Sequence, residues 1–322
     1  MNEILRGMVY MLAATIFLAL MNAIIKYVSN LGYPSMENIF FRAFFMMLSM
    51  LCVSFAAPFC NRVFKTQLKR PVFASKKPGG FRMIALRSFL GAVAMSMAFY
   101  NFATISLGIA TAFLQSAPLF VVFFGLFTRN RPRGFVVFAS VVGFAGVLCI
   151  ANPDSGEITS LNAIAGIIGA VCSAFAFFTL NALKSYYASG AIVLWYGTMM
   201  SILGGLGMLL PVPNMGGFVL PSLEILCLFV AAGIVGTIGQ WFMTQSYLLA
   251  PAPIVSPIGY MRIVWGLFLG VWLGDVLPSA TSSVGIALII LSGFLIALPS
   301  LWRLKMVRLW RLQIARRFHE KG

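Results

Sequence analysis

Ten long apolar stretches divide this sequence, and they limit its possible folds more than any other feature. Each is about 20 residues long, the length that a helix needs to cross the hydrocarbon core of a bilayer. Only α-helices and closed β-barrels satisfy their backbone hydrogen bonds in lipid, and these stretches are too long and continuous for barrel strands. We therefore predict an all-α integral membrane protein with ten transmembrane helices, at about 8–28, 37–58, 83–104, 108–127, 134–151, 161–183, 190–210, 222–247, 252–273 and 282–301.

The composition excludes several classes of protein. Hydrophobic residues make up 61% of the chain and charged residues only 9%, whereas a soluble domain carries about 25% charged residues. A water-soluble enzyme and a nucleic-acid-binding domain are therefore excluded, and nucleic acid is not an expected partner. The net charge of +16 is instead typical of basic loops that face anionic membrane lipid. The N-terminal apolar run is too long for a signal peptide, so we expect it to remain as the first span.

The distribution of basic residues predicts an orientation. With the N-terminus inside, 19 of the 23 lysines and arginines fall in inner segments and none falls in an outer loop. Asp154, Glu157 and Asp275 fall on the outer side. Because basic residues collect in cytoplasmic loops, we predict that both termini lie on the cytoplasmic side of the membrane. The membrane is most simply the inner membrane of a bacterium.

An acidic loop at 152–157 separates two sets of five predicted helices. We predict a first repeat at 1–152, a second at 153–302 and a basic cytoplasmic tail at 303–322. An odd number of helices per repeat makes the second repeat enter the membrane from the opposite side. Gly7 precedes Asn22 by the same 15 residues that separate Gly166 from Asn181, which weakly supports a repeat. Inverted repeats with broken helices are typical of secondary transporters.

Several segments resemble the EamA family of the drug/metabolite transporter superfamily. They are Arg87–Gly91, Ala117–Phe120, Gly143–Val147, Pro257–Trp265 and the pair Gly285 and Gly293. The resemblance covers about residues 5–300 and implies ten helices, two repeats and transport of a small molecule. It leaves the substrate open among amino acids, S-adenosylmethionine, riboflavin, opine-type metallophores and drugs. One departure is Arg129-Asn130-Arg131, where many members have a glutamate.

Arg262 is the leading candidate for a substrate contact. It lies ten residues into a predicted helix, near the bilayer midplane, where an arginine costs about 2.5–3.5 kcal/mol on insertion scales. No carboxylate is expected at the same depth. Two interpretations remain open: an anchor for a substrate carboxylate or phosphate, and a structural arginine bonded to carbonyls that helix breaks leave free.

Two prolines predict such breaks. Pro118 and Pro257 have no N–H to donate to the carbonyls of Leu114 and Pro253. Free carbonyls must face protein or water, so we predict that both breaks line a cavity. Gln115, within one turn of Pro118, is then either a substrate contact or a hydrogen bond between helices.

Other polar and aromatic residues have two interpretations each. Tyr260 and Trp265 flank Arg262 and either stack on a flat substrate or pack in the core. Asn22 and Asn181 occupy matching places in the two repeats and either contact substrate or join helices by hydrogen bonds. We include all four among the candidate substrate-binding residues.

Charged residues near helix ends suggest further roles. Lys26, Glu37 and Arg42 are predicted near the outer ends of the first two helices, where we expect an ion-pair cluster and a possible extracellular gate. Arg87 is predicted near the inner end of the third helix, where its side chain can extend to the headgroups.

The residues that enzymes and metal sites use are sparse. The single histidine, His319, lies in the basic tail, the five cysteines show no metal-ligand spacing, and no phosphate-binding glycine loop is present. We therefore expect no metal, no cofactor and no enzymatic activity. The predicted function is a secondary transporter, independent of ATP, for a small metabolite with an acidic or zwitterionic group. Export of drugs, riboflavin or a metallophore is the alternative, and a membrane enzyme or channel is a minor one. Oligomeric state is left open.

Overall fold

The computed structural model describes residues 3–64, 73–127, 134–150, 158–183, 185–250, 255, 258–296 and 298, without the side chains of 58–64, 178 and 181. All regular elements in these ranges are helices. They are α1 (Glu3–Asn30), α2 (Ser35–Phe64), α3 (Phe81–Thr104), α4 (Leu107–Gln115), α5 (Ala117–Gly125), α6 (Gly134–Ile150), α7 (Ser160–Leu183), α8 (Ser189–Gly207), α9 (Leu223–Leu249) and α11 (Met261–Trp272). A last helix spans Ala280–Ile296. The predicted all-α class is confirmed.

Seven helical segments in the described residues are long and apolar enough to cross a membrane, with α4 and α5 together forming one of them. Three shorter apolar helices are α6, α11 and the last helix. Each of the ten ranges predicted from the sequence overlaps one of these segments. The ten-span arrangement and the orientation of the termini remain predictions.

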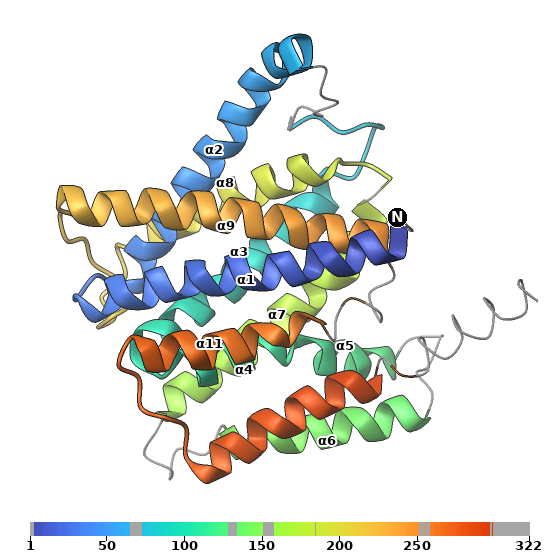
Figure 1. Ribbon diagram of the computed structural model, residues 1–322, viewed down its shortest axis with the longest axis vertical. Coiled ribbons are helices and arrows are strands. Elements are labelled where there is room, and N and C mark those ends of the chain that lie inside the picture. The colour runs from blue at the N-terminus through green and yellow to red at the C-terminus, as the bar shows by residue number, and fades with distance from the viewer. Residues whose placement is uncertain are drawn as a thin grey trace, which may run out of the picture.

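Helices from the first part of the chain pack on helices from the second part (Figure 1). The pairs are α1 with α9, α2 with α8, α3 with α7, and α4 with α11. At the lower edge of the view, α6 lies beside the last helix. There the hydroxyl of Ser292 donates to the carbonyl of Ala139 at 2.6 Å. The middle of the bundle is therefore formed by both parts of the chain.

Glycines allow the closest of these contacts. On α9, a Cβ atom added at Gly239 would lie 2.8 Å from Cγ of Leu18 in α1, and one at Gly236 would lie 2.8 Å from the sulfur of Met21. Distances this short leave no space for a side chain. Small residues at such spacing let helices approach closely in a membrane, where apolar burial alone provides little attraction.

The break expected near Pro118 divides one predicted helix into two. The range 108–127 is α4 and α5, which meet at Ser116. Pro118 lies in the first turn of α5, where a missing N–H is tolerated. The hydroxyl of Ser116 donates to the carbonyl of Phe113 at 2.6 Å, which satisfies one carbonyl at the end of α4. The second expected break, at Pro257, lies outside the described residues, and α11 begins only at Met261.

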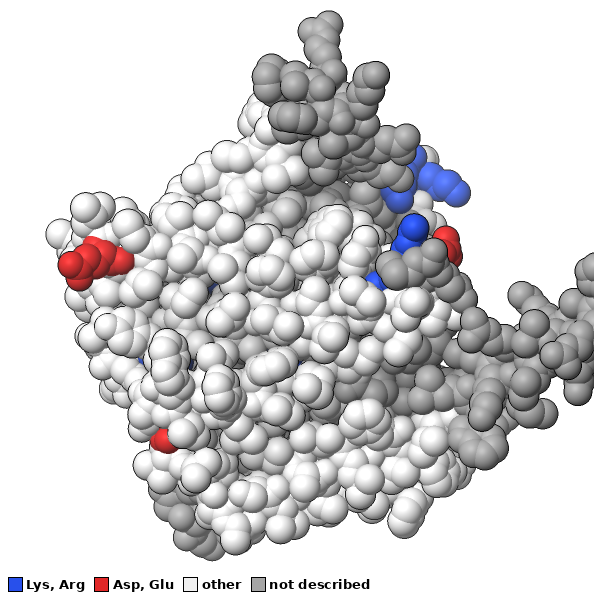
Figure 2. Space-filling view, in the orientation of Figure 1, with Lys and Arg blue, Asp and Glu red and all other residues white. Residues whose placement is uncertain are grey.

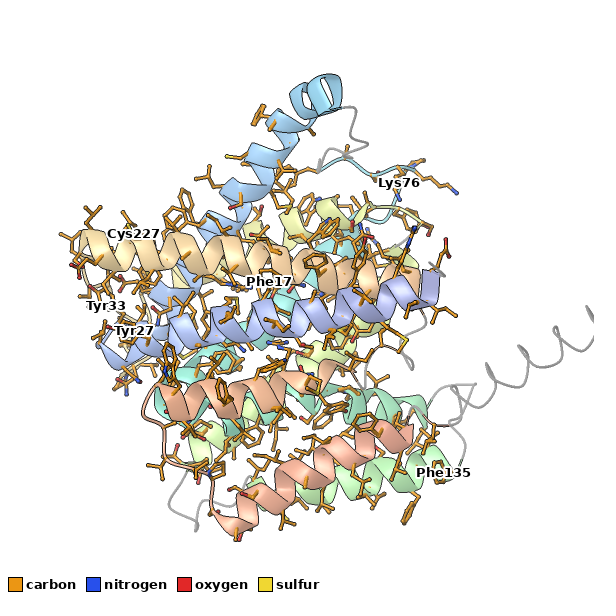
Figure 3. All side chains as sticks on the ribbon, viewed as in Figure 1. Phe17, Tyr27, Tyr33, Lys76, Phe135 and Cys227 are labelled. Carbon is orange, nitrogen blue, oxygen red and sulfur yellow. The ribbon has the colours of Figure 1, made fainter. Side chains whose placement is uncertain are left out.

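The outer surface of the bundle is apolar. In Figure 2 a broad band without charge crosses the molecule, with basic residues at the end that holds the N-terminus and acidic residues mainly at the other end. Figure 3 places Lys76 at the N-terminal end and Tyr27 and Tyr33 at the opposite end. Phe55 and Leu148 on this surface are 82% and 71% exposed. Such side chains suit contact with lipid, and the tyrosines suit its boundary with water.

Candidate functional site

A cavity lies in the middle of the bundle, between α1, α2, α3, the α4–α5 break, α7, α8, α9 and the start of α11. It offers about 70 Å³ to the centres of water-sized molecules. One water needs about 10–15 Å³ by this measure, so the cavity holds several waters or a small solute. Its walls are mainly apolar with a few polar groups, the usual composition of a small-molecule site.

Arg262 lines this cavity from the second position of α11 and is only 7% exposed. Its Nη1 donates to Oε1 of Gln115 at 3.5 Å. Gln115 in turn donates from Nε2 to the carbonyl of Gly259 at 2.8 Å, which joins the end of α4 to the segment before α11. These partners are neutral, so the charge of Arg262 is not balanced by them.

Asn22 of α1 is the second neutral partner of Arg262. In the amide orientation that satisfies both ends of the side chain, its oxygen accepts from Nη2 of Arg262 at 3.3 Å and its nitrogen donates to the carbonyl of Leu18 at 3.2 Å. Three residues selected from the sequence, Arg262, Gln115 and Asn22, therefore lie together in the structure.

Arg42 lies in the same cavity, two turns inside α2, and is fully buried. Its Nη1 contacts the sulfur of Met200 at 3.3 Å, and its guanidinium lies 5.7 Å from the ring centre of Phe99. A thioether is a weak acceptor, and an aromatic face attracts a cation only modestly. We expected Arg42 near the outer end of its helix. The structure instead places it beside the central cavity, about two turns after the start of α2 at Ser35.

Arg87 is the third arginine of the cavity. It lies in the second turn of α3, is 5% exposed, and has its guanidinium 5.5 Å from the ring centre of Tyr196 in α8. A Cβ atom on Gly91, one turn further along α3, would collide with Nη1 of Arg87. Glycine at 91 therefore leaves the space in which this side chain folds toward Tyr196. The expected extension of Arg87 to the headgroups is wrong, because this space and the aromatic face hold it inside.

The expected ion-pair cluster of Lys26, Glu37 and Arg42 does not form among the described residues. Lys26 instead pairs with Oδ1 of Asp275 at 3.3 Å and donates to the carbonyl of Ile105 at 2.8 Å. Glu37 accepts from the backbone N–H of Val219 at 2.9 Å and holds the α8–α9 loop. Asp275 follows α11, far along the chain from Lys26. The expectation that Lys26 would pair with a residue close to it in the sequence was therefore wrong.

A helix C-cap explains the position of Asp275. Gly274 has φ +92°, a conformation that glycine adopts readily, and the N–H of Asp275 donates to the carbonyl of Gly270 at 2.8 Å. This cap turns the carboxylate back along α11, over Gly270, which has no side chain to obstruct it. Oδ2 of Asp275 then accepts from the N–H of Leu107, the first residue of α4, at 2.7 Å.

Other residues selected from the sequence lie elsewhere. Tyr260 is 2% exposed and packs against Gly293 of the last helix, and neither Tyr260 nor Trp265 lines the cavity. Asn181 lies near the end of α7, but its side chain is outside the described part of the structure. Pro257 is outside it entirely, whereas Pro118 lines the cavity. The aromatic residues that do line it are Tyr196, Tyr247 and Phe177.

No group of three or more metal-ligating side chains occurs in the ranges that the structure describes. The chemical capacity of the site therefore comes from its guanidinium groups, amides and phenols. These groups are able to bind and orient a solute by charge and hydrogen bonds.

Comparison with known proteins identifies the family. The chain is 37% identical over 302 residues to an uncharacterized transporter of Helicobacter pylori (strain J99 / ATCC 700824), a match that covers 93% of this chain and 97% of the relative. The model of the EamA-like transporter family matches residues 5–152. The chain belongs to the EamA-like transporter family.

Two further relatives of this EamA-like transporter have names that state a substrate. The pseudopaline exporter CntI of Pseudomonas aeruginosa (strain UCBPP-PA14) is 27% identical over 289 residues, which cover 89% of this chain and 94% of the relative. A riboflavin transporter of Rhizobium johnstonii (strain DSM 114642 / LMG 32736 / 3841) is 24% identical over 287 residues, 88% of each chain. A solved crystal structure shares the fold, with a TM-score of 0.59, 18% identity, and coverage of 92% of this chain and 98% of the other.

Sequence reasoning missed part of the site of this EamA-like, multi-pass membrane protein. Arg87 and Tyr196 were not selected, and Arg42 was assigned to the outer face. Like Arg262, Arg87 falls within a predicted span that contains no acidic residue, but its expected place near the end of that span kept it from being selected. For Tyr196 the sequence contains no comparable signal.

Proposed function

We propose that this EamA-like protein is a secondary transporter that moves a small metabolite across the cytoplasmic membrane by alternating access, with an acidic group of the substrate held by Arg262. The observation that carries the proposal is a buried guanidinium in a central cavity whose hydrogen-bond partners, Gln115 and Asn22, are neutral. A carboxylate or phosphate supplies the missing charge and can accept two hydrogen bonds from the planar fork of an arginine.

The arrangement of the helices supports this proposal. Both parts of the chain contribute to the cavity, and α4 ends beside it at Gln115 while α11 begins beside it. The N-terminal end of a helix carries partial positive charge, so the start of α11 adds to the attraction for an anion. In secondary transporters, broken helices at the interface of two repeats form the substrate site.

The alternative is export of a drug, riboflavin or a metallophore. The names of the pseudopaline exporter and the riboflavin transporter support a broad range of substrates for relatives of this chain. A membrane enzyme or a channel is a weaker alternative, since neither explains an arginine enclosed with neutral partners in a small cavity.

Counterflow in proteoliposomes tests the proposal. Vesicles containing the purified protein are loaded with one unlabelled metabolite, and uptake of the labelled metabolite is followed without ATP. The panel contains amino acids, di- and tricarboxylates, phosphate esters and riboflavin. We expect at least one acidic member to show uptake that depends on the same solute inside. Uptake that does not depend on internal solute indicates a channel, and its absence for every acidic member contradicts the proposal.

We also propose ten spans with both termini inside. The distribution of charge in Figure 2 supports this orientation, with basic residues at the N-terminal end. In a variant without native cysteines, we expect a cysteine at Leu220, in the α8–α9 loop, to react with an impermeant maleimide added to whole cells. A cysteine at Lys77 should react only after permeabilisation. The reverse pattern would contradict the orientation.

The Lys26–Asp275 pair is proposed as part of an outer gate. It lies at the end of α1 opposite the N-terminus and joins α1, the α3–α4 junction and the end of α11. In the proposed orientation this end faces the outside, so the pair closes the bundle there.

A further inference from the structure

Three guanidinium groups share the central cavity. Arg42, Arg87 and Arg262 are 0%, 5% and 7% exposed and come from α2, α3 and α11. No aspartate or glutamate is among the residues that line the cavity in the described part of the chain. The cavity therefore holds three positive charges, and no described side chain that lines it neutralises them.

Several donors of these arginines are also unused. Nε and Nη2 of Arg42, Nε of Arg87 and Nε of Arg262 are buried and have no hydrogen-bond partner among the described residues. Among the described residues, these three guanidinium groups contact a sulfur atom, two aromatic faces, the phenol of Tyr196 and two neutral amides. Burial of an unpaired charge is strongly unfavourable, so this arrangement is incomplete without an anion.

The surrounding helices make room for these cations. A Cβ atom at Gly91 would collide with Nη1 of Arg87, and one at Gly236 of α9 would lie 3.3 Å from Nε of Arg42. Tyr196 lies close enough to interact electrostatically with all three arginines. The three charges are therefore positioned by close packing of several helices.

The number of charges decides how much negative charge the ligand must bring. Arg42 lies near enough to Arg262 for their charges to repel each other. A ligand with one negative charge would balance one arginine and leave two unbalanced in a site of low polarity. A ligand with two or three negative charges can balance most of them and remove the repulsion.

We infer that the substrate of this carrier is a polyanion, a polycarboxylate or phosphate ester with at least two negative charges, bound by Arg262 at one acidic group and by Arg42 and Arg87 at another. The inference rests on the proposed function and narrows its substrate class. A substrate with one acidic group is compatible with the proposed function, but it would leave two of the three arginine charges unbalanced.

A charge series tests the inference. Butyrate, glutarate and tricarballylate carry one, two and three carboxylates on the same three-carbon core, and all are ionised at about pH 7.5. Each is added to the purified protein in neutral detergent at matched ionic strength, and Tm and Kd are measured. Glycerol 3-phosphate is measured in the same way, to test a phosphate ester in place of a dicarboxylate. We expect glutarate or glycerol 3-phosphate to bind roughly 30-fold tighter than butyrate, the factor that corresponds to the lower end of buried charge-pair energies.

Substitutions of Arg42 and Arg87 test whether these residues bind the second acidic group of the ligand. Arg42→Gln and Arg87→Gln should each remove most of the advantage of glutarate over butyrate, because each takes away a partner of the second carboxylate. Arg82→Gln, which removes an exposed arginine at the start of α3, is the matched control and should change neither affinity. Without ligand, neither cavity variant should lower Tm, because each removes an unbalanced charge.

Different outcomes separate this inference from the proposed function. Binding of butyrate as tight as that of the dianions and the trianion would overturn the inference and leave transport of a singly acidic metabolite intact. Absence of binding by all four probes would overturn the inference. Counterflow of only neutral or cationic solutes would overturn the proposed function as well. A lower Tm for Arg42→Gln and Arg87→Gln, with the advantage of glutarate unchanged, would assign both arginines a structural role.

Discussion

Replacement of Arg262 by alanine is expected to remove nearly all substrate affinity and to leave the empty protein at least as stable as before. The loss follows from the guanidinium fork, which we propose to pair with an acidic group in a site of low polarity. Truncation of one partner in such a pair costs about 2–5 kcal/mol, or roughly 30-fold to several thousand-fold in Kd. The measurement is Kd for the acidic solute identified by counterflow.

Stability distinguishes a binding arginine from a structural one. The hydrogen bonds of Arg262 to neutral amides are long, 3.5 Å to Gln115 and 3.3 Å to Asn22, and Arg42 repels its charge. Removal of the side chain should therefore not lower the Tm of the empty protein. Arg262→Lys should keep the charge but weaken binding, because an ammonium cannot reproduce the fork. Arg82→Ala controls for loss of net charge. Normal affinity in folded Arg262→Ala protein would exclude Arg262 from the site.

Replacement of Asp275 by alanine is expected to lower the free energy of unfolding by about 3–5 kcal/mol. The change leaves the ammonium of Lys26, whose side chain is 7% exposed, with the carbonyl of Ile105 as its one remaining partner in the described part of the chain. It also removes the acceptor of the N–H of Leu107 at the start of α4. Removal of one partner from a mostly buried pair leaves an uncompensated charge, which is the reason for the large effect. The measurement is Tm of the purified protein, which should fall together with the free energy of unfolding.

A double variant separates loss of the pair from loss of packing. Lys26→Met with Asp275→Leu should recover much of the stability, because apolar side chains of similar volume often replace a buried pair without loss. Glu224→Ala, an exposed acid in the first turn of α9, is the matched control and should change stability by no more than about 1 kcal/mol. An unchanged Tm for Asp275→Ala would show that the pair contributes little. If the pair also closes the outer end, Asp275→Ala should raise the reactivity of cavity cysteines from outside.

The helical class and the approximate positions of the helices could be predicted from the sequence because the bilayer imposes a local rule. Each span must be apolar and about 20 residues long regardless of what it packs against. The break before Pro118 could also be predicted, because the missing N–H of a proline disrupts the helix within its own turn. The polar surroundings of Arg262 were also predictable, because an arginine within a span needs polar partners in any fold.

Which side chains meet in the cavity was decided by the tertiary structure. Arg42, Arg87 and Arg262 come together from three helices, and Lys26 meets Asp275 from the other end of the chain, because α2 packs on α3 and α11 packs on α1. Tyr260 was selected for its place beside Arg262, yet it points to Gly293, while Tyr196 of α8 faces the arginines. Hydropathy indicates that a segment enters the membrane, but in lipid both faces of a helix are apolar. The rotation of each helix is therefore set only by close packing against its neighbours.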